Sequence, residues 1–330
     1  MKILLIRFSS IGDIVITSPI VRCVRTKYPE AELHFLTKEN YINLVSSNPF
    51  INKVISLKEG QEKNLIAELK TENYDLVIDL HKNLRTRRIK KHLRANWFSY
   101  KKLNIQKWLY VNFKLNLLPK KHLVDRYFDG IKSLEIFNDN KGLDYFFLSD
   151  ISFDLSKYKL KQNEYIVVSI GGTYATKQIP NTVLLEVFKR LNVKIVLIGG
   201  GVSDGAKAEE LCDRFQNNSL INLCNKLSID ESAFLIKNAS SIVTGDTGMM
   251  HIASAFDTKI EAVWGNTNPL FGMYAYRSNN QGINNHQVSV ACNPCSKLGS
   301  DKCPRGHFGC MNEQNIEQIV KNCLSIEPAQ

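Results

Sequence analysis

The first residues suited to chemistry follow a short apolar run at the start of the chain. Residues 2–8 read KILLIRF, and the five residues after them end in Gly12 and Asp13. Gly12 allows a tight backbone turn, and Asp13 stands where a helix is expected to begin. A carboxylate there either caps the helix by accepting backbone N–H groups or serves as a general base, and the two roles are compatible. The run lacks the Gly-x-Gly-x-x-Gly fingerprint of dinucleotide-binding domains.

A segment rich in glycine and threonine in the second half is suited to binding phosphate. Residues 169–177 read SIGGTYATK and follow an apolar run. Backbone N–H groups, the hydroxyl of Thr173 and the ammonium of Lys177 are donors that phosphate oxygens accept. The alternative is an ordinary flexible loop, because such composition is also typical of loops.

A sharper candidate for an anion site lies at residues 244–251, which read TGDTGMMH. Two glycines bracket Asp246 and Thr247 where a strand is expected to turn into a helix. Free backbone N–H groups and the helix dipole would meet a diphosphate at that turn. His251 falls inside the expected helix, where a histidine is usually packed or hydrogen-bonded, so we assign it no acid–base role.

Half of the eight cysteines gather near the end of the chain. Cys292, Cys295, Cys303 and Cys310 lie within 19 residues, with His307 among them. Four thiolates could close a tetrahedral structural zinc site, although the spacing departs from paired Cys-x2-Cys knuckles. Buried free thiols and a redox-dependent disulfide are the alternatives. We expect catalysis to require no cofactor, because the chain lacks the extended acidic clusters that hold a divalent cation on a diphosphate.

The net charge of +11 is concentrated in the first half. Residues 1–150 hold 26 Lys/Arg against 16 Asp/Glu, whereas residues 151–330 hold 17 against 16. One half is therefore expected to face a polyanion, which could be nucleic acid, an anionic membrane surface or a phosphorylated substrate. Residues 81–94 carry seven of the basic residues and form either a polyanion-binding surface or a solvated helix face.

The chain is expected to be cytoplasmic. It contains no run near the about 18 to 20 apolar residues that span a bilayer. The opening apolar run resembles the start of a signal peptide, but it ends at Arg7 and no small-residue cleavage site follows.

Alternating strands and helices must position these candidate residues. Strand-like runs lie at residues 2–8, 32–37, 53–57, 75–80, 165–170, 194–198, 241–244 and 260–264, and helical patterns at 181–191, 205–215 and 314–324. The alternation predicts parallel sheets, and the polar stretch 138–163 marks a domain boundary. We therefore predict an α/β protein of two Rossmann-like domains, residues 1–155 and 156–330, with ligands at the carboxyl ends of the strands.

Over nearly its whole length the chain resembles the heptosyltransferases of lipopolysaccharide core assembly, the family-nine glycosyltransferases. The segments that carry the resemblance are residues 2–13 (KILLIRFSSIGD), 79–85 (DLHKNLR), 124–127 (VDRY), 245–253 (GDTGMMHIA), 265–269 (GNTNP) and the cysteine cluster. It implies a GT-B fold, in which two Rossmann-like domains face a central cleft and the final helix crosses back onto the N-terminal domain. The N-terminal domain would hold the acceptor and the C-terminal domain ADP-heptose.

The resemblance also implies roles in the reaction. Asp13 would accept the proton of the attacking hydroxyl in an inverting displacement, which contributes about 10²- to 10⁴-fold in rate. Lys177, assisted by Thr173, would bind the leaving diphosphate, and Asp246 would accept hydrogen bonds from sugar hydroxyls. Further donors to the diphosphate would be Thr247, Gly248 and Met249.

Other implied contacts are to the ribose and the acceptor. Asp204 would reach the ribose, and Lys82, Arg85 and Arg126 would bind the acceptor. His81 and Lys82 stand where an uncharged pair is more usual in the bacterial members, which leaves the acceptor open. An anionic lipopolysaccharide core would place the protein peripherally, in a salt-sensitive manner, on the inner face of the inner membrane.

Two other functions remain open from the sequence alone. The first keeps the fold and mechanism but uses another sugar carried on ADP, GDP or UDP. The second is a non-enzymatic protein whose residues 82–94 bind nucleic acid or anionic lipid. We expect no nucleic-acid partner, because this stretch has no aromatic residues interleaved for base stacking.

Overall fold

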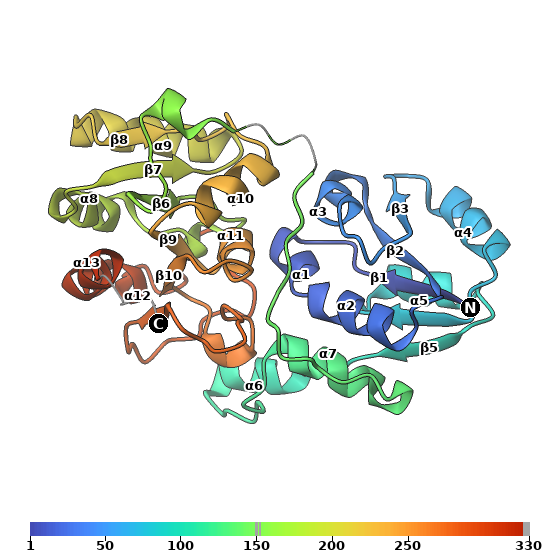
Figure 1. The fold of residues 1–330 in the computed structure, drawn as a ribbon. Helices are drawn as coiled ribbons and strands as arrows, with labels where there is room; N and C mark the ends of the chain where they lie inside the picture. Colours follow the sequence, from blue (N-terminus) through green and yellow to red (C-terminus); the bar gives the residue numbers. More distant parts are fainter. Residues whose placement is uncertain (149–150, 152, 326–330) are drawn as a thin grey trace. The chain divides into compact units, whose positions relative to one another are not determined.

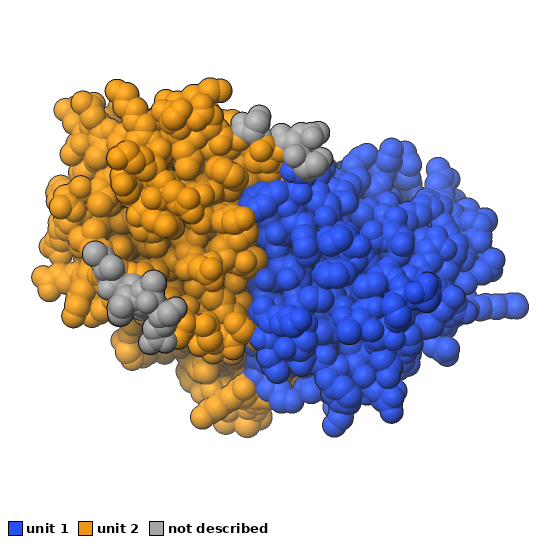
Figure 2. Space-filling view, viewed as in Figure 1, with its two compact units in different colours: residues 1–102, 121–150 blue, residues 103–120, 151–330 orange. Residues whose placement is uncertain are grey.

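The structure is a computed structural model that describes residues 1–148, 151 and 153–325. The chain divides into two compact units, coloured separately in Figure 2. Unit 1 comprises residues 1–102 and 121–150, and unit 2 comprises residues 103–120 and 151–330. The sequence suggested a single boundary at residue 155. The structure differs mainly in the segment 103–120, which lies within the N-terminal half but groups with unit 2.

Unit 1 is built on a five-stranded parallel sheet in the order β3-β2-β1-β4-β5 (Figure 1). The central strand β1 (Lys2–Ile6) is fully buried from Ile3 onwards. Strands buried on both faces read as continuous apolar runs, which is why this strand was evident in the sequence. The other strands are β2 (Glu32–Lys38), β3 (Lys53–Leu57), β4 (Leu76–Asp79) and β5 (Asn96–Ser99), of which β5 was not predicted.

The helices of unit 1 connect these strands. They are α1 (Ile11–Val15), α2 (Ser18–Lys27), α3 (Asn43–Ser46), α4 (Glu62–Thr71), α5 (Leu84–Lys90) and α7 (Leu123–Ile131), with 3₁₀ turns at Glu39–Tyr41 and Lys132–Leu134. One core cluster is formed by side chains of β1, β3, β4, α4 and α5, and it includes Phe8, Leu65 and Ile89. The basic stretch predicted at residues 81–94 is therefore helical over α5, whose Ile89 faces the core.

Unit 2 is built on a six-stranded parallel sheet in the order β11-β10-β9-β6-β7-β8 (Figure 1). Its strands are β6 (Tyr165–Ser169), β7 (Lys194–Ile198), β8 (Leu220–Asn222), β9 (Ser241–Gly245), β10 (Lys259–Trp264) and β11 (Ile283–Gln287). Its helices are α6 (Asn104–Phe113), α8 (Asn181–Arg190), α9 (Val202–Phe215), α10 (Ile229–Lys237), α11 (Gly248–Ala253), α12 (Gly309–Asn312) and α13 (Ile316–Leu324). Short 3₁₀ turns lie at Leu155–Tyr158, Ala175–Lys177 and Pro269–Phe271. The sheets confirm the predicted α/β class.

The final helix was expected to cross back onto the N-terminal domain. In the structure α13 packs against α8 and β10, and its Ile319 and Cys323 are buried in the core of unit 2. The segment that joins unit 2 from the other half of the sequence is instead α6.

The strand orders place a topological switch point in each sheet. In unit 1 the chain runs outward from β1 to β3 and then resumes beside β1 as β4. In unit 2 it runs outward from β6 to β8 and then resumes beside β6 as β9. Ligands of open α/β sheets bind at such points, outside the carboxyl ends of the two strands. The segments to inspect for a site are therefore those that follow β1, β4, β6 and β9.

The helices of the described residues are all too short or too polar to cross a membrane.

Candidate active site

Asp13 lies at the switch point of unit 1, in the first turn of α1 immediately after β1. Its Oδ2 accepts the backbone N–H of Ser10 at 3.1 Å and the hydroxyl of Ser10 at 2.9 Å. The N-cap of α1 is therefore Ser10 and not Asp13, which is the third residue of the helix and reaches back to Ser10. The side chain remains 22% exposed, so the carboxylate can still reach a ligand.

Arg7 holds the other oxygen of Asp13. Its Nη2 lies 2.5 Å from Oδ1 of Asp13, while Nη1 donates to the carbonyl oxygen of Leu80 at 2.6 Å and to the hydroxyl of Tyr127 at 3.1 Å. Burial alone would raise the pKa of Asp13, but the charge of Arg7 and the hydrogen bonds from Ser10 outweigh it and lower that pKa. Asp13 is therefore a fixed, ionised carboxylate at neutral pH.

The turn after β4 forms the other side of this switch point. Oδ1 of Asp79 accepts the backbone N–H groups of His81 at 3.0 Å and Lys82 at 2.7 Å. Lys82 has a left-handed backbone, with φ of 50°, and its Nζ donates to the carbonyl oxygen of Tyr100 at 2.8 Å. Of the predicted acceptor residues, Lys82 is thus held at the edge where Asp13 lies.

His81 is a residue of this edge to which the sequence analysis gave no role. Burial, followed by the charges of Arg7 and Lys102, lowers the pKa of His81 to about 3, so its imidazole is neutral. Its Nδ1 is buried and has no hydrogen-bond partner among the described residues. Asp13, whose charge raises that pKa, and Arg85, whose charge lowers it, make smaller contributions.

The other two predicted acceptor residues, Arg85 and Arg126, lie in different surroundings. Arg85 lies on the exposed face of α5 and pairs with Glu62 of α4, with 3.0 Å between Nε and Oε1. Arg126 is buried on α7, where burial lowers its pKa and the hydroxyls of Tyr100 and Tyr127 lie close enough to oppose that shift. Arg126 therefore lies near Tyr127, to which Arg7 donates, whereas Arg85 lies on the outer face of α5.

At the switch point of unit 2, the segment after β6 meets the turn after β9. Nζ of Lys177 lies 2.7 Å from Oδ2 of Asp246, and the hydroxyl of Thr267 donates to the same oxygen at 2.9 Å. The two side chains of the ion pair are only 19% and 10% exposed. Two segments that the sequence assigned separately to phosphate binding are thus joined by one ion pair.

A glycine allows the backbone of Lys177 to lie against the end of β9. A Cβ on Gly245 would overlap the carbonyl oxygen of Lys177, and one on Gly172 would lie 3.4 Å from the Cγ2 of Thr247. Thr247 is the N-cap of α11, and its hydroxyl lies 3.0 Å from that of Thr244. The predicted diphosphate donors Gly248 and Met249 are the first two residues of that helix, so their N–H groups point out of its N-terminus.

Thr173 and its neighbours show how the segment after β6 is supported. Thr173 is exposed, whereas Thr176 is buried. The hydroxyl of Thr176 donates to the carbonyl oxygen of Ser300 at 2.7 Å and accepts the N–H of Ser300 at 2.8 Å. The cysteine-rich segment therefore braces the loop that carries Lys177.

Asp204 stabilises the neighbouring turn, which follows β7. It is buried in the first turn of α9, and its Oδ2 accepts the N–H of Gly200 at 3.0 Å. Lys207, one turn later, is a half-buried lysine whose Nζ donates to the carbonyl oxygens of Ile179 at 2.8 Å and Ile170 at 3.3 Å. These contacts give Asp204 a structural role, and its predicted contact with a ribose stays a prediction.

The four clustered cysteines lie close together but do not form a closed ligand set. Burial raises the pKa of Cys310 to about 12, with smaller contributions from Cys295, Cys292 and Cys303. Sγ of Cys292 lies 3.5 Å from Nε2 of His307, and all four thiols are free. Within the described residues, no three of their ligand atoms lie within 4.8 Å of one another. A structural zinc site stays a prediction from the spacing.

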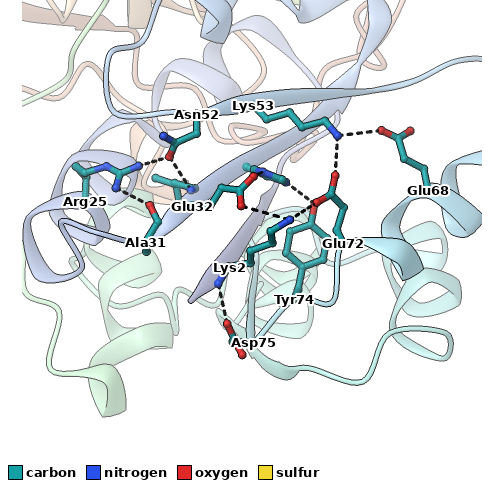
Figure 3. Close-up of polar contacts among 12 residues, drawn as sticks. Lys2, Arg25, Ala31, Glu32, Asn52, Lys53, Glu68, Glu72, Tyr74 and Asp75 are labelled. Atoms are coloured by element: carbon teal, nitrogen blue, oxygen red, sulfur yellow. Dashed lines mark hydrogen bonds and ion pairs between the residues drawn. The ribbon is translucent and has the colours of Figure 1, made fainter.

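The described residues do contain one group with metal-ligand spacing, Glu32, His34 and Glu72, at the amino edge of the sheet of unit 1. Figure 3 shows that its carboxylates are already engaged. Nζ of Lys2 and Nζ of Lys53 each lie 2.6 Å from an oxygen of Glu72. The hydroxyl of Tyr74 lies 2.8 Å from Nδ1 of His34. This group is a charge network that ties strand ends together.

Arg7 and Lys207 are the supporting residues that the sequence analysis missed. Each has a signal that could have found it. Arg7 follows four buried apolar residues, and Lys207 occupies a core-facing position of α9 among Ala208 and Leu211. A cation in such surroundings is rarely buried without partners.

Comparison with known proteins gives one family. The family model for glycosyltransferase family 9 (heptosyltransferase) matches residues 63–301. The chain is 25% identical over 292 residues to lipopolysaccharide heptosyltransferase 1 of Campylobacter coli, an alignment that covers 81% of this chain and 84% of the relative.

Solved structures show the same fold. The chain matches a family 9 glycosyltransferase from Veillonella parvula with a TM-score of 0.76 and 21% identity, over 97% of this chain and 95% of the other. It matches an E. coli heptosyltransferase with ADP-2-deoxy-2-fluoro heptose with a TM-score of 0.68 and 21% identity, over 91% and 96%. The predicted GT-B class of two Rossmann-like domains is confirmed.

Proposed function

Because the chain belongs to glycosyltransferase family 9, the heptosyltransferase family, we propose that it transfers heptose from ADP-heptose to the inner core of lipopolysaccharide. The observation that carries this proposal is the placement of the candidate residues. Each unit has its candidates at the switch point of its own sheet, Asp13 after β1 and Lys177 with Asp246 after β6 and β9. The donor and acceptor named for the relatives support the choice of substrates.

Unit 2 binds the donor. The ammonium of Lys177, together with the N–H groups of Gly248 and Met249 and the hydroxyl of Thr247, neutralises the charge that develops on the leaving diphosphate. Asp246 keeps Lys177 in position through Oδ2, and its Oδ1 is the oxygen that would accept a sugar hydroxyl. Thr173 is exposed at the same loop and completes the phosphate contacts.

Unit 1 activates the acceptor. A sugar hydroxyl is too weak an acid to ionise beforehand, so Asp13 accepts its proton as the new bond forms. The low pKa of Asp13 keeps the carboxylate ready in its basic form throughout the neutral range. A single displacement of this kind inverts the anomeric carbon.

Cations of unit 1 would hold an anionic acceptor near Asp13. Lys82 and Arg126 both lie at Tyr100 on the switch-point edge. Arg85 would have to leave Glu62 to take part, which makes its contribution the weakest of the three. The basic helix α5 adds attraction to an anionic membrane surface, about 1 kcal/mol per basic residue near it. We therefore propose a peripheral, salt-sensitive attachment to the inner face of the inner membrane.

The donor is tested by calorimetric titration of ADP, UDP, GDP and ADP-heptose into the wild type and Lys177→Ala. We expect selective binding of ADP and ADP-heptose, weakened about tenfold or more by the substitution, because a charge-assisted contact to phosphate is lost. Lys189→Ala is the matched control, since Lys189 is an exposed lysine of unit 2 that pairs with Glu186. Selective binding of UDP or GDP would retain the fold and mechanism but replace the donor.

The base is tested by Asp13→Asn. We expect nearly complete loss of turnover with unchanged affinity for ADP, because the substitution keeps the shape of the side chain but removes the proton acceptor. Turnover close to that of the wild type would exclude Asp13 as the base.

A further inference from the structure

The exposed apolar side chains of the described residues are unevenly distributed. Thirteen large ones are exposed, and five of these lie within residues 105–117. They are Ile105, Trp108, Phe113, Leu115 and Leu117, which are between 50% and 72% exposed. We refer to these five side chains as the α6 face. Scattered exposed apolar residues are normal, but a contiguous group marks an interaction surface.

The opposite side of α6 attaches the helix to unit 2. Nζ of Lys114 donates to the carbonyl oxygens of Cys292 at 2.8 Å and Pro294 at 2.7 Å. The ring of Tyr110 packs edge-on against Phe271, with 6.0 Å between centroids. Lys107, Tyr110 and Lys114 share one side of the helix, and Ile105 and Trp108 lie on the other. The apolar face is therefore presented outward by a helix that is fixed from behind.

The charge around the α6 face restricts its partner. Residues 101–121 contain six lysines and no Asp or Glu. Phe113 packs edge-on against Trp108, with 5.3 Å between centroids, so the aromatic side chains form one unit within this basic surrounding. Aromatic and aliphatic side chains on one side and lysines around them are typical of helices that lie in the interface of an anionic membrane.

We propose that the α6 face inserts into the interfacial region of an anionic phospholipid bilayer. A second copy of the chain fits less well, because residues 101–121 contain no Asp or Glu that could meet the lysines of another copy. Single-stranded nucleic acid also fits less well, because Ile105, Leu115 and Leu117 have no π-face on which a base can stack.

The inference deepens the proposed function, since an acceptor of the lipopolysaccharide core is carried by a membrane. It adds an apolar anchor to the electrostatic attraction of α5. The attachment through α6 therefore persists in part at salt concentrations that screen surface charges.

The test uses the full chain and vesicles that contain no lipopolysaccharide. Co-sedimentation is measured with phosphatidylcholine vesicles, with and without phosphatidylglycerol, at low and high salt. The variant is Ile105→Ser/Trp108→Ser/Phe113→Ser. Its matched control replaces three exposed apolar residues elsewhere, Phe137→Ser/Val202→Ser/Leu298→Ser. Titration with ADP checks that each variant keeps its fold.

We expect the wild type and the control to bind vesicles containing phosphatidylglycerol. The α6 variant should bind these vesicles at least about a hundredfold more weakly. The vesicle-induced shift in tryptophan emission should also disappear in Trp108→Phe while that variant still binds. Equal binding by the α6 variant and the wild type would overturn the inference, as would a wild type that binds ADP but stays in solution at low salt.

Two further results would overturn it in favour of another partner. One is a wild-type dimer, seen by sedimentation without lipid, that the α6 substitutions dissociate. The other is retention of a single-stranded RNA oligonucleotide that the same substitutions abolish. A protein that binds vesicles through the α6 face but does not bind ADP would instead contradict the proposed function alone.

Discussion

Arg7→Met tests whether the ion pair beside Asp13 sets the pH dependence of the reaction. The guanidinium lies 2.5 Å from Oδ1 of Asp13, and the charge of Arg7 lowers the pKa of that carboxyl against the opposing effect of burial. Methionine fills a similar volume without charge, so the substitution leaves burial to act on Asp13 with only Ser10 as a donor.

The size of the effect follows from the contact. An arginine beside an aspartate lowers its pKa by about 1–3 units, and each unit corresponds to about 1.4 kcal/mol. We therefore expect the pKa of Asp13 to rise in Arg7→Met, because burial then acts on the carboxyl without the opposing charge of Arg7. The ion pair stabilises the fold above the unfolded pKa of 3.8, and this contribution is lost as pH falls through the lower folded pKa. The variant lacks that contribution at neutral pH.

The assay is the pH profile of kcat/KM, measured by ADP release with a soluble inner-core acceptor. The acidic limb of the profile should move upward by about 1–3 pH units, while activity at alkaline pH recovers towards that of the wild type.

Arg22→Met is the matched control. Arg22 is also a buried arginine of unit 1 that pairs with two carboxylates, Asp139 and Asp144. Its replacement should lower stability without moving the acidic limb. A limb that stays in place in Arg7→Met, or that moves equally in both variants, would refute the assignment of the limb to Asp13.

Three further predictions concern Gly245 and Lys207 of unit 2 and Glu72 of unit 1. Gly245→Ala should lower the free energy of unfolding by about 1–3 kcal/mol and weaken ADP binding, because its Cβ would overlap the carbonyl oxygen of Lys177. Glu72→Gln should cost about 1–2 kcal/mol in urea unfolding at neutral pH. Hydrogen bonds from Lys2 and Lys53 lower the pKa of Glu72 from 4.5 to about 2, so that difference should disappear as pH falls through this range. Burial lowers the pKa of Lys207 from 10.5 to about 8, so wild-type stability should rise with pH between these values, and Lys207→Met should flatten the rise.

Each of these predictions has a control. Gly200→Ala adds a Cβ with no atom within 4 Å and should be tolerated. Glu164→Gln removes an exposed carboxylate that pairs with Lys161 at 3.6 Å and should have little effect. Lys189→Met changes an exposed lysine and should leave the dependence on pH intact. If a control changes the measured stability or binding as much as its test variant does, the corresponding mechanism is wrong.

The sequence predicted the central strands more fully than the edge strands. The run at 194–198 matches the inner strand β7 residue for residue, because inner parallel strands need apolar side chains on both faces. Among the edge strands only β3 was predicted, at residues 53–57, where Ile55 and Leu57 are buried. The other edge strands β5, β8 and β11 were missed because they contain no buried apolar side chain. β11 also faces a polar partner, since Nε2 of His286 lies 2.5 Å from Oε2 of the buried Glu261. Such a strand contains no apolar run from which it could be predicted.

The candidate site was predictable where a special residue follows a strand. Asp13, Lys177 and Asp246 stand at strand ends, and the rule that ligands bind there was enough to single them out. Arg7 and Lys207 could have been noticed as cations in apolar surroundings, but their partners were not predictable, because these are carbonyl oxygens and side chains distant in sequence. The grouping of residues 103–120 with unit 2 likewise depends on tertiary contacts of α6 that leave no local pattern.

The candidate sites of the two units each contain an ion pair, and the roles of the two charges are exchanged between them. In unit 1 a buried cation, Arg7, fixes the anion Asp13, and in unit 2 an anion, Asp246, fixes the cation Lys177. Burying an ion pair costs more desolvation energy than it usually returns, so neither pair is explained by stability alone. Both pairs instead keep a reactive charge in one position before the ligand arrives, and preorganised charge is what stabilises a transition state. In the proposed reaction the diphosphate would compete with Asp246 for Lys177, so the pair would also favour the more highly charged leaving group over the bound donor.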